Sequence, residues 1–135
     1  VVSQKASVVW SFKVPDQPND NPKQFIQSAP VLHVKDPQAS AEFYRDELGF
    51  NFDFAMDGYS IVWRDNSAIH FSQGPVEVAG MAIFQWVVDV DGYYAELVSR
   101  NVVIERDIGD QPYGVREFSV IDINGISVVF GQDLE

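Results

Sequence analysis

The sequence contains no cysteine, which excludes disulfides, thiolate metal ligands and a cysteine nucleophile. No apolar run approaches the roughly 20 residues that a membrane-spanning helix needs, and the first stretch, Val1–Trp10, is too polar for a signal peptide. The Gly-x-Ser-x-Gly elbow, a phosphate-binding glycine loop and the His-Glu-x-x-His zinc motif are also absent. These absences favour a protein of the reducing cytoplasm and give no sign of hydrolase or nucleotide-dependent chemistry.

Basic residues are scarce, because 9 Lys and Arg stand against 20 Asp and Glu, giving a formal net charge of −11. Nucleic acids and anionic membrane surfaces require a positive binding surface, so the sequence predicts neither as a partner. A negative field speeds the approach of cationic ligands. The same excess of acidic residues also serves solubility alone.

The chain has 135 residues, of which 46% are hydrophobic, and this is enough for one domain with its own core. The stretch Pro15–Lys23 carries three prolines and no apolar periodicity, which is typical of a loop. We therefore expect residues 1–28 to form an N-terminal arm or linker anchored by Trp10 and Phe12. Residues 29–135 are expected to form a single domain.

The pattern of residues 29–73 predicts one strand, one helix and three further strands. Asp36 followed by Pro37 is typical of a helix N-cap and first helical position, and Gly49 is typical of a helix end. The apolar stripe of this helix is predicted to run through Ala39, Phe43 and Leu48. The predicted strands are Ala29–Lys35, Phe50–Met56, Tyr59–Arg64 and Ser67–Ser72.

After a linker at Gln73–Gly80, the same order of elements repeats in residues 81–132. The last two strands form a hairpin from Tyr113 to Gly131, which turns at Asp122–Gly125 because Asn and Gly accept positive φ at little cost. The elements before it are strand Met81–Val90, helix Asp91–Arg100 and strand Val102–Arg106. Two modules of one topology predict an α+β fold, in which each helix covers one face of a sheet and the other faces line a cleft.

Two segments carry a resemblance to a known family. They are Phe43–Phe50 (FYRDELGF) and Arg116–Val120 (REFSV), the latter leading to Asn124–Gly125. In this order and at this separation, they resemble the vicinal-oxygen-chelate superfamily, also called the glyoxalase/bleomycin resistance protein/dioxygenase superfamily. Over residues 29–132 the chain is most similar to the bleomycin resistance proteins. The resemblance implies two βαβββ modules that form curved mixed sheets around a cleft, with the first and last strand of each module in central positions.

The resemblance also bears on metal binding, because enzymes of this superfamily hold a divalent metal ion in the cleft. The four ligand positions of the family correspond to Ala29, His70, Ala82 and Val129 in this sequence. Three of these side chains have no donor atom, so we expect no cofactor and no catalytic residue. An alternative metal site would use His33, His70 and Glu117, and would support a glyoxalase-like lyase or isomerase or an extradiol-type dioxygenase.

The resemblance implies a homodimer that sequesters an antibiotic in its clefts, and the residues suggest which side chains would contact such a ligand. Rings and acidic groups suit a flat cationic molecule through stacking and cation–π contacts. Each ring could instead fill the core, each histidine could bond to backbone, and Glu117 could serve an ion pair, since alternation sends only one of Arg116 and Glu117 into the cleft. A cleft that binds a metabolite for regulation is a further reading. The predicted ligand-binding residues are His33, Phe54, Trp63, His70, Trp86, Tyr113 and Glu117.

Overall fold

The computed structural model describes residues 24–134, and in this range the chain forms two mixed β-sheets of four strands, each with one helix. The predicted anchors Trp10 and Phe12 lie outside the described residues. Residues 24–28 of the predicted arm contain no helix or strand, and neither do residues 29 and 30, where the first strand was predicted to begin. Neither helix of the described range is long and apolar enough to cross a membrane.

The first module forms a sheet that we call sheet A. Its elements in chain order are β1 (Val31–Val34), α2 (Pro37–Asp46), β2 (Asn51–Met56), β3 (Tyr59–Arg64) and β4 (Ser67–Gln73). The strand order is β1-β4-β3-β2. The pairing of β1 with β4 is parallel, and the other two pairings are antiparallel.

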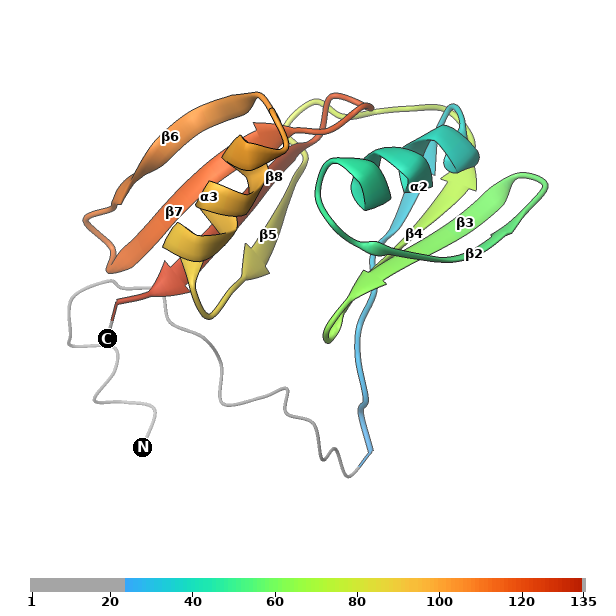
Figure 1. Cartoon of the computed structure of the whole chain (residues 1–135). Helices are drawn as coiled ribbons and strands as arrows, with labels where there is room; N and C mark the ends of the chain where they lie inside the picture. The colour runs from blue at the N-terminus through green and yellow to red at the C-terminus, as the bar shows by residue number, and fades with distance from the viewer. Residues whose placement is uncertain (1–23, 135) are drawn as a thin grey trace.

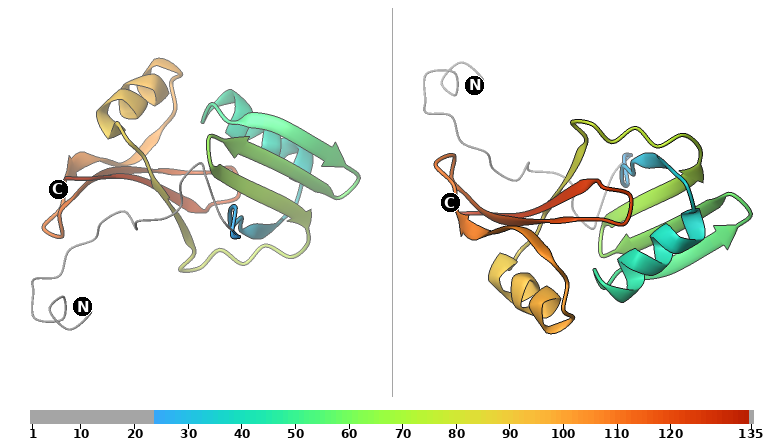
Figure 2. Two further views of the ribbon diagram at one scale, coloured as in Figure 1. Left: turned by 90° about the horizontal axis from the view of Figure 1, so that it is seen from below. Right: turned by 90° about the horizontal axis from the view of Figure 1, so that it is seen from above.

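The second module forms sheet B with the same arrangement. Its elements are β5 (Ala82–Trp86), α3 (Val90–Ser99), β6 (Ile104–Asp110), β7 (Val115–Ile121) and β8 (Ser127–Asp133), in strand order β5-β8-β7-β6. Figures 1 and 2 show the two modules side by side, each with its helix against one face of its own sheet. The predicted fold class of two βαβββ modules is confirmed. However, β1 and β5 lie at sheet edges rather than centrally, because each bonds to a neighbour on one side alone.

In helix α2, local sequence determines where the helix begins, whereas tertiary packing determines which of its side chains are buried. The Asp36 carboxylate accepts a hydrogen bond from the Ala39 N–H at 3.1 Å, as the N-cap prediction requires. The helix ends at Asp46 with Glu47 as its C-cap, and Gly49 follows in the turn with a φ of +76°. The predicted apolar stripe is confirmed in part, because Leu48 is fully buried and Phe43 packs against the core. However, the most buried side of the helix carries Pro37, Ser40, Ala41 and Tyr44 rather than Ala39.

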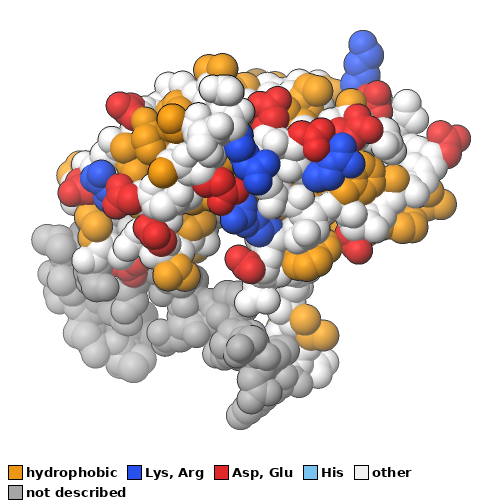
Figure 3. Space-filling model, in the orientation of Figure 1, with side chains coloured by type: hydrophobic (Ala, Val, Ile, Leu, Met, Phe, Trp, Pro, Cys, Tyr) orange, Lys and Arg blue, Asp and Glu red, His pale blue; other side chains and the backbone are white. Residues whose placement is uncertain are grey.

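The two modules are joined by polar contacts beside the helices. The Arg64 guanidinium of β3 donates to both carboxylate oxygens of Glu96 in α3, at 2.9 and 3.0 Å. The Tyr93 hydroxyl of α3 donates to the Leu48 carbonyl at 2.6 Å. The hydrogen bond from Arg64 lowers the pKa of Glu96. Figure 3, in the orientation of Figure 1, shows acidic and basic side chains next to one another on this face.

A β-bulge in β2 changes which face of sheet A its phenylalanines occupy. Phe52 pairs with the fully buried Val62, whereas Phe54 pairs with Ile61, which points to the opposite face. The shift of register lies at Asp53, between the two rings. Strict alternation would have placed both rings on one face, so the bulge assigns Phe52 to the core and leaves Phe54 43% exposed.

Candidate functional site

Four of the predicted ligand residues lie on the outer face of sheet A, by which we mean the face turned away from helix α2. His70 pairs across β3 with Ile61, and Ile61 pairs with Phe54, so these three side chains form one row. Trp63 is the next residue of β3 on the same face after Ile61, and it is 40% exposed. His33 of β1 completes the set at the other edge of the sheet. This face therefore presents rings and imidazoles that the core does not use.

The two histidines make separate contacts. Their strands are neighbours, but the register pairs His33 with Ser72, so His70 lies one row away. A hydrogen bond of 2.6 Å joins the His70 Nδ1 to the Tyr59 hydroxyl, and the two rings meet edge to face. His33 instead lines a small cavity of about 200 Å³ with Glu77 and residues of the linker. The histidines are therefore not arranged as a pair that shares one ligand.

On the outer face of sheet B, Glu117 lies at the centre of a row in which both of its cross-strand partners are glycines. Its neighbours across the strands are Gly131 of β8 and Gly109 of β6, and Trp86 of β5 lies beyond Gly131. A Cβ added to Gly109 would have no described atom within 4 Å, so the space on that side is open. Arg116 points to the helix side, where it bonds to two aspartates, as strand alternation requires.

The Glu117 carboxylate is buried with one oxygen satisfied and the other not. The residue is 3% exposed, and its Oε2 accepts a hydrogen bond from the Tyr113 hydroxyl at 2.8 Å. The same oxygen lies 3.6 Å from Nη2 of Arg106. Its Oε1 has no hydrogen-bond partner within the described part of the chain. Burial and this bond raise the pKa of Tyr113, so the phenol remains a donor at neutral pH.

Irregular pairing of β6 brings further polar groups to the outer face of sheet B. The register of β6 against β7 shifts on both sides of Arg106. As a result, the neighbouring residues Glu105 and Arg106 both bond to the buried Ser119. Its hydroxyl donates to Glu105 Oε1 at 2.8 Å and accepts from Arg106 Nε at 3.1 Å. The carboxylate of Glu105 and the guanidinium of Arg106 thus meet at Ser119 near Glu117, a cluster that the alternation rule cannot predict.

Aromatic rings flank this polar cluster. Phe84 and Trp86 of β5 meet edge to face with ring centroids 4.8 Å apart, and Phe84 is 38% exposed. A Cβ on Gly131 would come within 2.6 Å of the Phe84 ring, so the ring lies directly over the β8 backbone. Gly131 is the cross-strand partner of Glu117. The buried carboxylate therefore has aromatic rings on the Gly131 side, whereas a Cβ added to Gly109 on the other side would meet no described atom within 4 Å.

The residues that the structure describes do not form a site that fits a divalent metal. Ala29, Ala82 and Val129, which the sequence resemblance aligns with metal-ligand positions of the family, have no side-chain donor atom. Among residues 24–134 no three His, Cys, Asp or Glu side chains gather closely enough to hold an ion. The alternative triad of His33, His70 and Glu117 is therefore not brought together, because the histidines belong to sheet A and the glutamate to sheet B.

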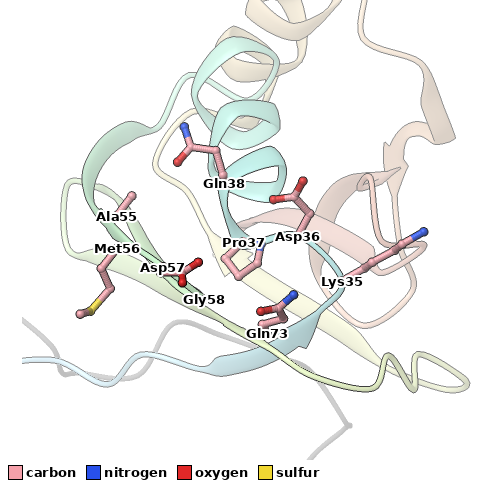
Figure 4. Close-up of a pocket in the computed structure, with 9 residues that line it drawn as sticks. All are labelled: Lys35, Asp36, Pro37, Gln38, Ala55, Met56, Asp57, Gly58 and Gln73. Carbon is pink, nitrogen blue, oxygen red and sulfur yellow. The ribbon is translucent and has the colours of Figure 1, made fainter.

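A larger cavity of about 550 Å³, shown in Figure 4, is lined by none of the predicted ligand residues. It opens where the start of α2 meets the turn between β2 and β3. One polar group of its lining is already hydrogen-bonded within the protein, since the Asp36 carboxylate accepts the Ala39 N–H at the start of the helix. Its lining residues are Lys35, Asp36, Pro37, Gln38, Ala55, Met56, Asp57, Gly58 and Gln73.

The structure thus divides the predicted ligand residues into two sets. His33, Phe54, Trp63 and His70 lie on sheet A, and Trp86, Tyr113 and Glu117 lie on or beside sheet B. Sequence reasoning did not assign Arg106, Glu105 or Ser119 to the site. No periodic signal could have found the first two, because a register shift places them. Phe84 could have been included, since it lies two residues before Trp86 on the same strand.

Comparison with known proteins agrees with this geometry. A family model described as "Glyoxalase superfamily protein" matches residues 20–135. The bleomycin resistance protein of Geobacillus stearothermophilus is 25% identical over 130 residues, which cover 82% of this chain and 98% of that protein. The bleomycin-binding protein of Streptomyces verticillus, solved with copper(II)-bleomycin, is 28% identical with a TM-score of 0.68, over 81% of this chain and 97% of that one. A lactoylglutathione lyase of Agrobacterium tumefaciens shares the fold at 18% identity, with a TM-score of 0.66 over 83% of this chain and 96% of that one.

The chain belongs to the glyoxalase, or vicinal-oxygen-chelate, superfamily. Within that superfamily its similarity in sequence and in structure is to the bleomycin resistance proteins.

Proposed function

We propose that this protein is a metal-free binding protein that sequesters a cationic aromatic small molecule. The observation that carries the proposal is the Oε1 atom of Glu117, a buried carboxylate oxygen with no partner among the described residues. A buried acceptor left unpaired costs about 1–3 kcal/mol, and more when it is charged. A ligand that donates an N–H to this oxygen would remove that cost.

The surroundings of Glu117 indicate which donor fits. A charged N–H group makes a stronger hydrogen bond to a carboxylate than a neutral one does. The net charge of −11 favours the approach of a cation. The rings of Phe84 and Trp86 offer edge and face contacts to a flat aromatic group beside the cation.

The relatives support the same ligand class, since bleomycin is bound by the Streptomyces verticillus protein. The alternative of a metal-dependent lyase, isomerase or dioxygenase gains no support from the donor groups of residues 24–134. We extend the proposal to a homodimer, because the two sets of ligand residues lie on separate sheets, and a second chain would allow a set from each chain to face the other. Sedimentation of the purified protein tests this extension, and a monomer at all concentrations would contradict it.

Calorimetric titration tests the proposal with three probes: bleomycin, benzamidine and benzamide. Benzamidine is a planar cation, and benzamide has nearly the same shape without the charge. We expect heat with bleomycin and benzamidine and far less with benzamide. Replacement of Glu117 by Gln keeps the shape of the side chain but removes its charge. We expect the affinity for benzamidine to fall at least about tenfold, or about 1.4 kcal/mol.

The matched control is Arg116→Gln, which alters the neighbouring residue on the opposite face of β7. This variant should bind the probes as the parent protein does. Absence of heat with both bleomycin and benzamidine would defeat the proposal. One tightly held divalent ion per chain in elemental analysis would defeat its metal-free part.

A further inference from the structure

We propose that Arg106 is a specificity-determining residue, a built-in counter-ion of Glu117 that the cation of the ligand displaces. The inference rests on the proposed function, because it concerns the same carboxylate. It goes beyond the proposed function because it names the residue that competes with the ligand for Glu117 and the kind of cation that displaces this residue.

The first observation is the unequal burial of the two partners. The Glu117 side chain is 4% exposed and the Arg106 side chain is 55% exposed. The carboxylate is therefore fixed in the sheet, while the guanidinium can move into water at little cost. Their closest atoms are 3.6 Å apart, beyond hydrogen-bond distance, and the contact is to Oε2 rather than to the unpaired Oε1.

The second observation is the contrast with other ion pairs of the chain. Arg64 bonds to Glu96 with two short contacts of 2.9 and 3.0 Å. Arg116 bonds to two aspartates at 2.9 and 3.0 Å. Arg106 instead directs its Nε to the Ser119 hydroxyl at 3.1 Å and leaves the carboxylate without a direct N–H. Arg106 thus balances the charge of Glu117 without satisfying its hydrogen-bonding capacity.

The third observation is the space around the carboxylate. Gly109 and Gly131 are the cross-strand partners of Glu117, so neither directly paired residue places a side chain beside the carboxylate, and Arg106 reaches it from elsewhere on β6. The ring of Phe84 lies over Gly131. On the other side, a Cβ added to Gly109 would meet no described atom within 4 Å. Because the carboxylate is buried and the Phe84 ring lies beside it, we expect the cation that replaces Arg106 to be compact and attached directly to a flat ring. An aryl amidinium or a ring-bound primary ammonium has this form.

Because Arg106 and the ligand compete for Glu117, the inference predicts the direction in which the affinity for benzamidine changes when Arg106 is replaced. Replacement of Arg106 by Gln removes the competitor, so benzamidine should bind more tightly. We expect a gain of about two- to fivefold, the range that corresponds to an exposed ion pair. Arg116→Gln removes the same charge from the other face and should change the affinity much less at about 0.15 M salt, where distant charges are screened. Benzamide should bind both variants as it binds the parent protein.

The experiment is calorimetric titration of the full chain and its variants with benzamidine, benzamide and bleomycin. In the double variant Arg106→Gln/Glu117→Gln the gain should disappear, because no carboxylate remains to be competed for. Arg106→Met serves as a second neutral variant if Arg106→Gln does not fold, as judged by circular dichroism.

Equal or weaker benzamidine binding by the Arg106 variants, compared with Arg116→Gln, would overturn the inference and leave the proposed function standing. Tighter benzamide binding by the Arg106 variants would also overturn it, because the effect would then be steric. No heat from the parent protein with either bleomycin or benzamidine would overturn the proposed function and this inference with it.

Discussion

At the scale of single residues, the fold depends on a small number of buried polar groups that find partners far along the chain. Tyr44 of α2 is fully buried, and its hydroxyl donates to the Asp122 carboxylate at 2.8 Å. The other oxygen of Asp122 accepts the backbone N–H groups of Asn124 and Ile126. One carboxylate therefore fixes the turn between β7 and β8 and holds it against the helix of the other module. Burial, together with the neighbouring Asp122, raises the pKa of Tyr44 well above its usual value.

Tyr44→Phe should destabilise the protein by about 1.5–3 kcal/mol, because it removes a hydrogen bond to a buried charged group. The ring and its packing against Phe71 are retained, so the loss belongs to the hydroxyl. The measurement is urea unfolding. The control is Tyr94→Phe, whose hydroxyl bonds to the exposed Asp107 at 2.7 Å and whose loss should change stability by less than about 0.5 kcal/mol. Equal losses of stability in the two variants would show that the buried hydrogen bond to Asp122 stabilises the protein no more than the exposed bond to Asp107 does.

At the scale of elements, β-bulges decide which residues reach the outer faces of the sheets. In β2 the bulge at Asp53 separates Phe52, which packs against the core, from Phe54, which does not. In β6 two shifts of register bring Glu105 and Arg106 to the same serine. Such shifts depend on how a partner strand bonds, so they are not visible in the periodicity of one strand.

The bulge in β2 predicts unequal costs for two substitutions that strict alternation would make equal. Phe52→Ala should lower the free energy of unfolding by about 2–3 kcal/mol, since this ring is partly buried in the core. Phe54→Ala should lower it by less than about 1 kcal/mol, because the residue is 43% exposed. Urea unfolding of both variants at one protein concentration measures the difference. A larger loss for Phe54→Ala would mean that β2 pairs in another register.

At the scale of the whole molecule, charged and polar side chains connect the two modules, in addition to a buried apolar cluster that contains residues of both. Arg64 and Glu96 connect β3 with α3, and Asn124 of the β7–β8 turn donates to the Ser40 hydroxyl of α2 at 3.1 Å. A chain with a net charge of −11 repels itself, so removal of an acidic residue would ordinarily be neutral or favourable. Glu96 is an exception to that rule, because it is paired.

Glu96→Gln should therefore lower stability by about 1 kcal/mol at neutral pH. The pKa of Glu96 is lowered by its hydrogen bond from Arg64, so its folded value lies below its unfolded value. The stabilisation is fully present above the unfolded pKa of about 4.3 and is lost as the pH falls through the lower folded value. Urea unfolding from about pH 7 to pH 3 should show the two proteins converging at the acidic end.

The control for this prediction is Asp53→Asn, which removes an exposed carboxylate of β2. It should leave stability unchanged or slightly higher at neutral pH, as expected for relief of repulsion. A gap between Glu96→Gln and the parent protein that persists at the acidic end would assign the loss to packing rather than to charge.

Much of the fold follows from local sequence. Asp36 before Pro37 predicted the start of α2, and the Asn124–Gly125 turn predicted the last hairpin, in which Gly125 has a φ of +86°. These features depend on backbone conformations that a few residues favour, so they can be read without knowledge of the rest of the chain. Arg106, by contrast, could not be assigned to the candidate site from the sequence, because it reaches Glu117 through a shift of register.

The sequence alone determined the order of the elements, the duplication of the module and the lack of donors at Ala29, Ala82 and Val129. These depend on periodicity, turn residues and side-chain chemistry, which are properties of neighbouring residues. Tertiary structure decided that Tyr44 is core, that the predicted ligand residues divide between two sheets, and that Glu117 is buried with one oxygen unpaired. The physical reason is that the burial of a residue and its strand pairing depend on segments distant in sequence. The register in which those segments pair cannot be read from a local sequence pattern.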